Sequence, residues 1–310
     1  MNDGTVKILT ITDHPFDIHR HGSHDLTTKG REALEWLREH GGSVRADRYH
    51  SYIRSIESFG ENEKSPDTEE EFYSFLNAHS EINELIRIYE ALQSTESSSF
   101  QNALRRIASG NIFKGAAPHQ PERDFLYELS VASRILRAGY EVDLNGLADM
   151  ITIVDGRKVY VEAKRVKSRG QLGKRISEAD KQLARRISQD ASSQSVGFAA
   201  IGLTDIMNPY NSMAFVDEAE SLRKHNSNML HSFVAENDLD FHRGMTNRCM
   251  GVMADFSMQG MEYDTVNGNI NGMRLMNCRV ATFRRYATRS GKLNVVDRIL
   301  PGMANQSLFV

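Results

Sequence analysis

The stretch Gly146–Val166, GLADMITIVDGRKVYVEAKRV, decides the fold class because it has the pattern of a strand, a tight turn and a second strand. Two segments rich in Ile, Val and Tyr flank an Asp-Gly dipeptide at positions 155 and 156. Asp-Gly favours a two-residue hairpin turn. If this dipeptide is the centre of the turn, Val154 pairs with Arg157 and the register of the whole hairpin is set.

This register predicts that two acids face each other across the hairpin. Asp149 lies opposite Glu162, and Lys164 lies on the same face because side chains alternate along a strand. Facing carboxylates repel each other unless a positive charge lies between them. Mg²⁺, which prefers carboxylate, water and phosphate oxygens, would fill this place. The alternative is an exposed hairpin with an ordinary ion pair.

The segments on either side of the hairpin extend the pattern to helix, strands, helix and strand. Arg123–Ala138 predicts a helix that Gly139 ends, and Tyr140–Leu144 predicts a short strand after it. Glu128 falls inside the apolar stripe of this helix and needs a partner there, unless it reaches water from the edge of the stripe. Beyond the hairpin, residues 171–188 predict a basic helix and residues 195–203 a buried strand.

The order Glu128, Asp149 and Glu162-Ala163-Lys164 resembles the active site of the PD-(D/E)XK nuclease superfamily. The resemblance covers roughly residues 123–204, and Ala148 stands where the family's name has proline. It implies an α/β fold with a restriction-endonuclease-like core, in which a mixed central sheet is flanked by helices. It also implies an enzyme, a Mg²⁺-dependent endonuclease or other nuclease that hydrolyses phosphodiester bonds of nucleic acid, DNA rather than RNA.

The resemblance also assigns roles to single residues. Asp149 and Glu162 would ligate Mg²⁺, for which Mn²⁺ can substitute, together with the backbone carbonyl of Ala163. Glu128 would bind the metal directly or through water. Lys164 would orient the attacking water and offset phosphate charge, as a compact ammonium can.

The helix after the hairpin is the predicted nucleic-acid-binding element. It belongs to a run of nine basic residues between Lys164 and Arg186 that contains only Glu178 and Asp180 as acids. Such a run binds phosphates, although a merely solvated helix face has the same composition. The candidate nucleic-acid contacts are Lys174, Arg175, Lys181 and Gln182. Some branches of the family place a Gln or Lys on the second helix of the core, and Lys181 and Gln182 could fill this position.

The rest of the chain predicts a second domain. Residues 1–100 carry 10 basic and 19 acidic residues, whereas the remainder is net basic. After an early strand at 6–11, five helices are predicted, at residues 28–40, 45–58, 69–79, 82–93 and 100–108. We therefore expect a mostly helical accessory or regulatory domain at 1–118 and the nuclease-like domain at 119–310. The acidic domain is a candidate dock for a regulatory protein or for a second copy of the chain.

The C-terminal part predicts a long helix at 213–234 and further strands at 249–256 and 275–286, with turn material at 267–272. Cys249 and Cys278 form no CxxC pair and are expected to be small apolar fillers. No membrane span or secretory signal is found, which predicts a cytoplasmic protein without a membrane partner. No P-loop, dinucleotide-binding or GxSxG motif is present.

Two alternatives stay open. The His- and Asp-rich loop at 13–25, DHPFDIHRHGSHD, has a composition typical of transition-metal sites, although the further motifs of metallophosphoesterases are missing. The second alternative is a catalytically silent nucleic-acid-binding or scaffold protein on the same fold. Among the biological roles that use this core are restriction, repair and phage defence.

Overall fold

A computed structural model describes residues 8–10, 18–41, 47–61, 66–109, 120–144, 149–241, 248–266, 269–286, 294–304 and 306–309. The contacts within the chain divide it into two compact units. The sheet unit comprises Met1–Asp17 and Ala138–Asn305, and the helical unit comprises Ile18–Arg137 and Gln306–Val310. This division does not fall at the predicted boundary between residues 118 and 119, because the helix that ends at Arg137 packs against helices of the N-terminal part.

The described part of the helical unit contains the helices α1 (Ser23–Gly41), α2 (Asp47–Ile56) with a π-helical turn at Glu57–Glu61, α3 (Glu69–Leu92), α4 (Ser98–Ala108) and α5 (Pro121–Arg137). Thr68 and Ser97 cap α3 and α4 by accepting the backbone N–H groups of Glu71 and Phe100. The prediction of two helices over residues 69–93 was wrong: α3 is continuous, because the polar residues Ser80 and Glu81 do not break a helix and Glu81 has buried partners.

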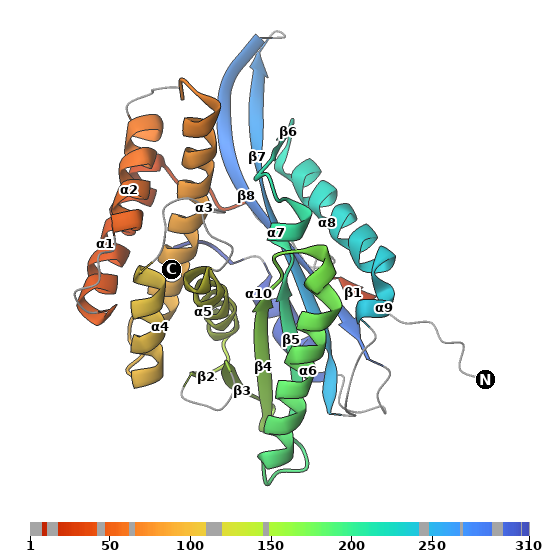
Figure 1. Cartoon of the computed structure of the whole chain (residues 1–310). Coiled ribbons are helices and arrows are strands. Elements are labelled where there is room, and N and C mark those ends of the chain that lie inside the picture. The colour runs from red at the N-terminus through yellow and green to blue at the C-terminus, as the bar shows by residue number, and fades with distance from the viewer. Residues whose placement is uncertain are drawn as a thin grey trace. The chain divides into compact units, whose positions relative to one another are not determined.

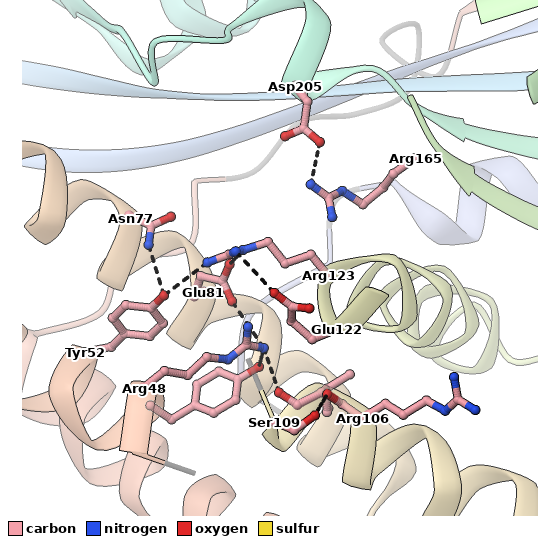
Figure 2. Close-up of polar contacts among 12 residues, drawn as sticks. Arg48, Tyr52, Asn77, Glu81, Arg106, Ser109, Glu122, Arg123, Arg165 and Asp205 are labelled. Atoms are coloured by element: carbon pink, nitrogen blue, oxygen red, sulfur yellow. Dashed lines mark hydrogen bonds and ion pairs between the residues drawn. The ribbon is translucent and has the colours of Figure 1, made fainter. Parts of the chain in front are cut away.

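An ionic network joins α2, α3 and α5 inside the helical unit (Figure 2). Arg123 Nε donates to Glu81 Oε1 at 2.7 Å, and Arg48 Nη2 lies 3.8 Å from Glu81 Oε2. Arg48 also donates to the carbonyl of Ile107 at the end of α4, and Arg123 lies 3.6 Å from Glu122. These charges are almost completely buried, so each depends on the others for compensation.

The sheet unit is built on one mixed eight-stranded sheet (Figure 1). The strand order is β1-β8-β7-β5-β4-β3-β2, and β6 is an additional strand that pairs with β7. The strands are β1 (Ile8–Thr10), β2 (Val142–Asp143), β3 (Met150–Val154), β4 (Arg157–Arg165), β5 (Val196–Gly202), β6 (Met213–Val216), β7 (Cys249–Val266) and β8 (Asn269–Arg285). The chain therefore has an α/β fold with a mixed sheet, as predicted at this level.

The β3–β4 hairpin has the predicted register. Val154 pairs with Arg157 and Met150 with Val161. Asp155 and Gly156 form the turn with φ values of 49° and 73°, the left-handed conformation that this dipeptide tolerates. On the far side of β4, β5 pairs in parallel, so the connection between them crosses over the sheet.

Helix α6 (Leu172–Gln189), which a short 3₁₀ turn at Arg169–Gln171 precedes, makes this crossover. Its buried residues Ile176, Ala179, Leu183 and Ile187 pack on the face of the sheet that carries Tyr160, Ala199 and Ile201. Helices α8 (Ala219–Glu236) and α9 (Asp238–Phe241) add Leu222, Phe233 and Phe241 to the same core. Two further helices of the unit are α7 (Thr204–Met207) and α10 (Asn294–Met303).

The prediction of one helix over residues 213–234 was wrong. Met213–Val216 is strand β6, which pairs in parallel with residues 259–262 of β7, and the helix begins only at Ala219. Pairing with a distant segment overrides local helix propensity here. Strands β7 and β8 also extend well beyond the predicted 249–256 and 275–286, and they form a long ribbon at one end of the sheet unit (Figure 1).

Neither Cys249 nor Cys278 forms a disulfide, and burial raises the pKa of the Cys278 thiol to about 11. Among the described helices, none combines the length and the apolar character that crossing a membrane requires.

Candidate active site

Asp149 and Glu162 lie together at the open end of the β3–β4 hairpin. Asp149 directly precedes β3, and Glu162 follows Val161, the partner of Met150, so the register places the two acids opposite each other. The backbone N–H of Ala163 donates to Asp149 Oδ2 at 2.8 Å, which holds this carboxylate against β4. The structure therefore brings together the acid pair that the sequence predicts.

Lys164 lies between the two carboxylates. Its Nζ donates to Glu162 Oε1 at 2.7 Å and lies 3.5 Å from Asp149 Oδ2. The side chain of Glu162 is 0% exposed, whereas those of Asp149 and Lys164 are 15% and 20% exposed. The repulsion between the acids is thus offset by a lysine of the same hairpin, and the lysine remains partly open to solvent.

Arg186 of α6 is the residue of this site that the sequence reasoning missed. Its Nη1 forms an ion pair with Glu162 Oε2, so each oxygen of the buried carboxylate contacts one cation. Arg186 was visible only as one member of the basic run. Two observations could have selected it: the crossover must place α6 against β4, and Arg186 is one residue from the buried Ile187 on the helix.

Gln182 lies one helical turn before Arg186 and is half-buried. Its Oε1 is buried and has no hydrogen-bond partner among the described residues. A buried amide oxygen without a hydrogen-bond partner is uncommon, and such an oxygen commonly accepts a hydrogen bond from a water or contacts an ion or a ligand group. Lys181, by contrast, is exposed. The structure therefore distinguishes two residues that the sequence treated alike.

Lys174 and Arg175 lie on the first turn of α6 and face Glu178. Arg175 Nη1 lies 3.0 Å and Lys174 Nζ 4.0 Å from this carboxylate. The Lys174 side chain is 74% exposed. Exposed pairs of this kind contribute little to stability, so both cations remain accessible to a phosphate.

Glu128 lies on α5, in the helical unit, at a half-buried position. The hairpin acids belong to the sheet unit, and each unit is compact by itself. The role of Glu128 as a further metal ligand stays a prediction.

The donors on the hairpin fit a hard divalent cation. Mg²⁺ in proteins is commonly held by one or two carboxylates, with waters and substrate phosphate completing its shell. Asp149 uses Oδ2 for both of its contacts, and its Oδ1 has no partner among the described residues. Within the described ranges no group of three or more His, Cys, Asp or Glu side chains is placed to hold a metal.

The rival histidine loop is only partly described. Asp13, His14 and Asp17 lie outside the described residues, while His19, His21 and His24 are exposed. Although His21 is exposed, partial desolvation of its ring, as the largest cause, lowers its pKa. The described part of this loop thus contains no cluster of three metal ligands. A transition-metal site in residues 13–25 stays an alternative.

Two further polar contacts lie in the sheet unit. Arg165 follows Lys164 on β4, points to the opposite face and forms an ion pair with Asp205 of α7 (Figure 2). Asp180 of α6 is completely buried, and its Oδ2 accepts a hydrogen bond from the Tyr286 hydroxyl at 3.0 Å. Burial raises the pKa of Asp180 to about 6, and this acid too was not singled out by sequence.

Comparisons with known proteins found no matching family model, no matching curated protein and no matching solved structure.

Proposed function

We propose that the chain is a divalent-metal-dependent nuclease that hydrolyses phosphodiester bonds of nucleic acid, DNA rather than RNA. The observation that carries the proposal is the convergence of Asp149, Glu162 and Lys164 on one face of the hairpin, with the lysine ammonium in contact with both carboxylates. Restriction, repair and phage defence are the biological settings in which such an enzyme would act.

The connectivity of the sheet unit supports this proposal. Strands β2, β3 and β4 are neighbours in antiparallel order, and α6 leads over the sheet to the parallel strand β5. This agrees with a restriction-endonuclease-like core that has its acid pair on the central hairpin. In this proposal the helical unit is an accessory or regulatory domain that docks a protein partner or a second copy.

The residues that would hold Mg²⁺ are Asp149, Glu162 and the carbonyl of Ala163, with Glu128 as the predicted further ligand. When bound, Mg²⁺ or Mn²⁺ would make the attacking water more acidic and offset the charge that grows on the phosphate. The acid pair has the ligand chemistry for this role because carboxylate oxygens are hard donors. Asp149 and its neighbour Lys164 are partly exposed to solvent, from which a metal ion would come.

The protein's own cations would orient the reacting groups and bind the nucleic-acid backbone. Lys164 is fixed by two carboxylates, so its ammonium can orient a water or a phosphate oxygen without losing much conformational freedom. Lys174, Arg175 and Lys181 would hold the flanking backbone through phosphate contacts, which carry affinity and little sequence information.

A catalytically silent nucleic-acid-binding or scaffold protein is the second candidate, and one observation favours it. Lys164 and Arg186 already balance the two carboxylates, so the acid pair is electrostatically satisfied by the protein itself. A protein that binds nucleic acid without cleaving it would have no need of a metal at this place.

Incubation of the purified protein with single- and double-stranded DNA and with RNA separates the two candidates. Cleavage is expected in Mg²⁺ or Mn²⁺ and should stop in EDTA. Lys164→Ala and Asp149→Asn, purified identically, control for contaminating nucleases and should be inactive. Binding without cleavage of any substrate in either metal would support the scaffold.

Lys164→Ala also separates catalysis from binding. The variant loses the ammonium that acts on the water and the reacting phosphate, so turnover should fall by about 100-fold or more. Affinity for nucleic acid should fall by less than about tenfold, because the cations of α6 remain. Normal cleavage by Lys164→Ala would show that the hairpin is not the active site.

A further inference from the structure

The contact between Arg186 and Glu162 has no role in the chemistry described so far. Glu162 is completely buried and has one cation on each oxygen, Lys164 Nζ on Oε1 and Arg186 Nη1 on Oε2. Arg186 itself is 12% exposed. A metal that uses Glu162 as a ligand would therefore have to compete with these two cations for its oxygens.

The charges of this group are balanced as they stand. Asp149 and Glu162 carry two negative charges, and Lys164 and Arg186 carry two positive charges. A divalent cation that enters alone adds two uncompensated charges beside a buried group, which is strongly unfavourable away from bulk water. A cation that enters together with phosphodiester anions adds less charge, because each diester contributes one negative charge.

Arginine is suited to exchange one anion for another. Its planar guanidinium binds carboxylate and phosphate oxygens with the same forked geometry. Arg186 lies on α6, the helix that also presents Lys174 and Arg175 to solvent. A phosphate that is drawn to this helix could take over the guanidinium and release Glu162.

We propose that Arg186 keeps the acid pair closed to metal until a nucleic-acid phosphate arrives, so that metal and phosphate bind cooperatively. This inference rests on the proposed nuclease function. Arg186 acts here as a positioning residue, since its role is to control the availability of Glu162.

The test measures Mn²⁺ affinity by calorimetry or by the paramagnetic signal of free Mn²⁺, with and without a short thymidine oligonucleotide whose integrity is checked on a gel. In the wild type the oligonucleotide should tighten Mn²⁺ binding by about tenfold or more, and Mn²⁺ should tighten oligonucleotide binding by the same factor. Arg186→Gln should bind Mn²⁺ about tenfold more tightly than the wild type when the oligonucleotide is absent. The oligonucleotide should then add less than about threefold.

Two control variants isolate the charge at position 186. Arg186→Lys keeps the cation and should retain weak metal binding without the oligonucleotide. Arg185→Gln removes an exposed cation from the neighbouring position of the same helix and should leave the Mn²⁺ affinity without the oligonucleotide at the wild-type value. Folding of each variant is checked by circular dichroism. If Arg186→Gln does not fold, the inference is tested on the wild type alone, by the factor by which the oligonucleotide tightens Mn²⁺ binding. A factor below about twofold overturns the inference.

The outcomes distinguish this inference from the function on which it rests. If the wild type cleaves with metal but Arg186→Gln binds Mn²⁺ no more tightly, only the role of Arg186 is refuted. If the wild type neither binds Mn²⁺ nor cleaves in any condition, the proposed function and the inference fall together.

Discussion

Asp180 should make the stability of the sheet unit depend on pH in a direction opposite to that of most carboxylates. It is 0% exposed, accepts one hydrogen bond from Tyr286, and leaves its Oδ1 without a hydrogen-bond partner among the described residues. Burial therefore raises its pKa from 3.8 to about 6, although the Tyr286 hydroxyl opposes this rise. The folded state holds the proton of this acid more tightly than the unfolded state.

The magnitude follows from the linkage between protonation and folding. A pKa difference of about 2 units corresponds to about 3 kcal/mol, the penalty of ionising Asp180 in the folded state. The penalty is absent below the unfolded pKa, grows as pH rises from about 4 to about 6, and is constant above that range. About 2 kcal/mol of it develops between about pH 4.5 and about pH 7.5.

Asp180→Asn removes the titration while keeping the shape and an oxygen acceptor for Tyr286. Urea unfolding of both proteins across this pH range should show the variant gaining about 2 kcal/mol on the wild type as pH rises. Other titrating groups are common to both proteins and cancel. The single tryptophan, Trp36, lies in the helical unit, so far-UV circular dichroism must follow the sheet unit.

Asp190→Asn is the matched control. Hydrogen bonds from the Ser192 backbone N–H, the Ser195 hydroxyl and the Tyr160 hydroxyl lower the pKa of Asp190 to about 2. The stability that this acid provides is present above the unfolded pKa and is lost as pH falls towards 2. The difference between Asp190→Asn and the wild type should therefore change little between about pH 4.5 and about pH 7.5. A difference between Asp180→Asn and the wild type that is equally flat would refute the assignment of a raised pKa to Asp180.

Three further predictions concern stability and binding. Glu81→Ala leaves Arg48 and Arg123 buried without their shared acid, so tryptophan fluorescence during urea unfolding should report a loss of about 3–5 kcal/mol in the helical unit. Gly251→Ala should destabilise the sheet unit by about 2 kcal/mol or more, because φ is 150° and the new Cβ would clash with the carbonyl oxygen of Arg284. Gly170→Ala has open space around the new Cβ and should be neutral in thermal unfolding. A triple alanine variant of α6 should bind nucleic acid more weakly and reduce the slope of log K against log salt by about one unit per lost phosphate contact, and an unchanged slope would show that these cations touch no phosphate. Its positions are Lys174, Arg175 and Lys181.

The hairpin could be predicted from sequence because local chemistry sets its register. The Asp155-Gly156 turn admits one pairing of the two strands, and that pairing places Asp149, Glu162 and Lys164 on one face. The early strand at Ile8–Thr10, the buried strand at Val196–Gly202 and the basic helix α6 were also predictable, since each carries its own periodicity or apolar run.

Contacts between distant segments could not be predicted in this way. Strand β6 forms because residues 213–216 pair with residues 259–262, and no pattern within 213–234 contains this information. The same holds for Asp180 and Tyr286, which are 106 positions apart. The acid repulsion predicted a cation between Asp149 and Glu162, but sequence alone did not determine that Lys164 and Arg186 would contact them.

The four charges at the end of the hairpin are difficult to explain by stability alone. Taking a carboxylate such as Glu162 out of water is costly, and in buried ion pairs the attraction of the cations often offsets this cost only in part. Apolar residues of similar volume often serve a core equally well or better. Apolar residues at these positions would satisfy a purely structural role. A site in which metal and phosphate replace contacts between the protein's own charges needs ion pairs that balance each other and can separate. Asp149 and Lys164 remain partly exposed while Glu162 is buried, so the group is in contact with solvent through Asp149 and Lys164. The burial and the pairing together therefore favour a functional over a structural role for this group.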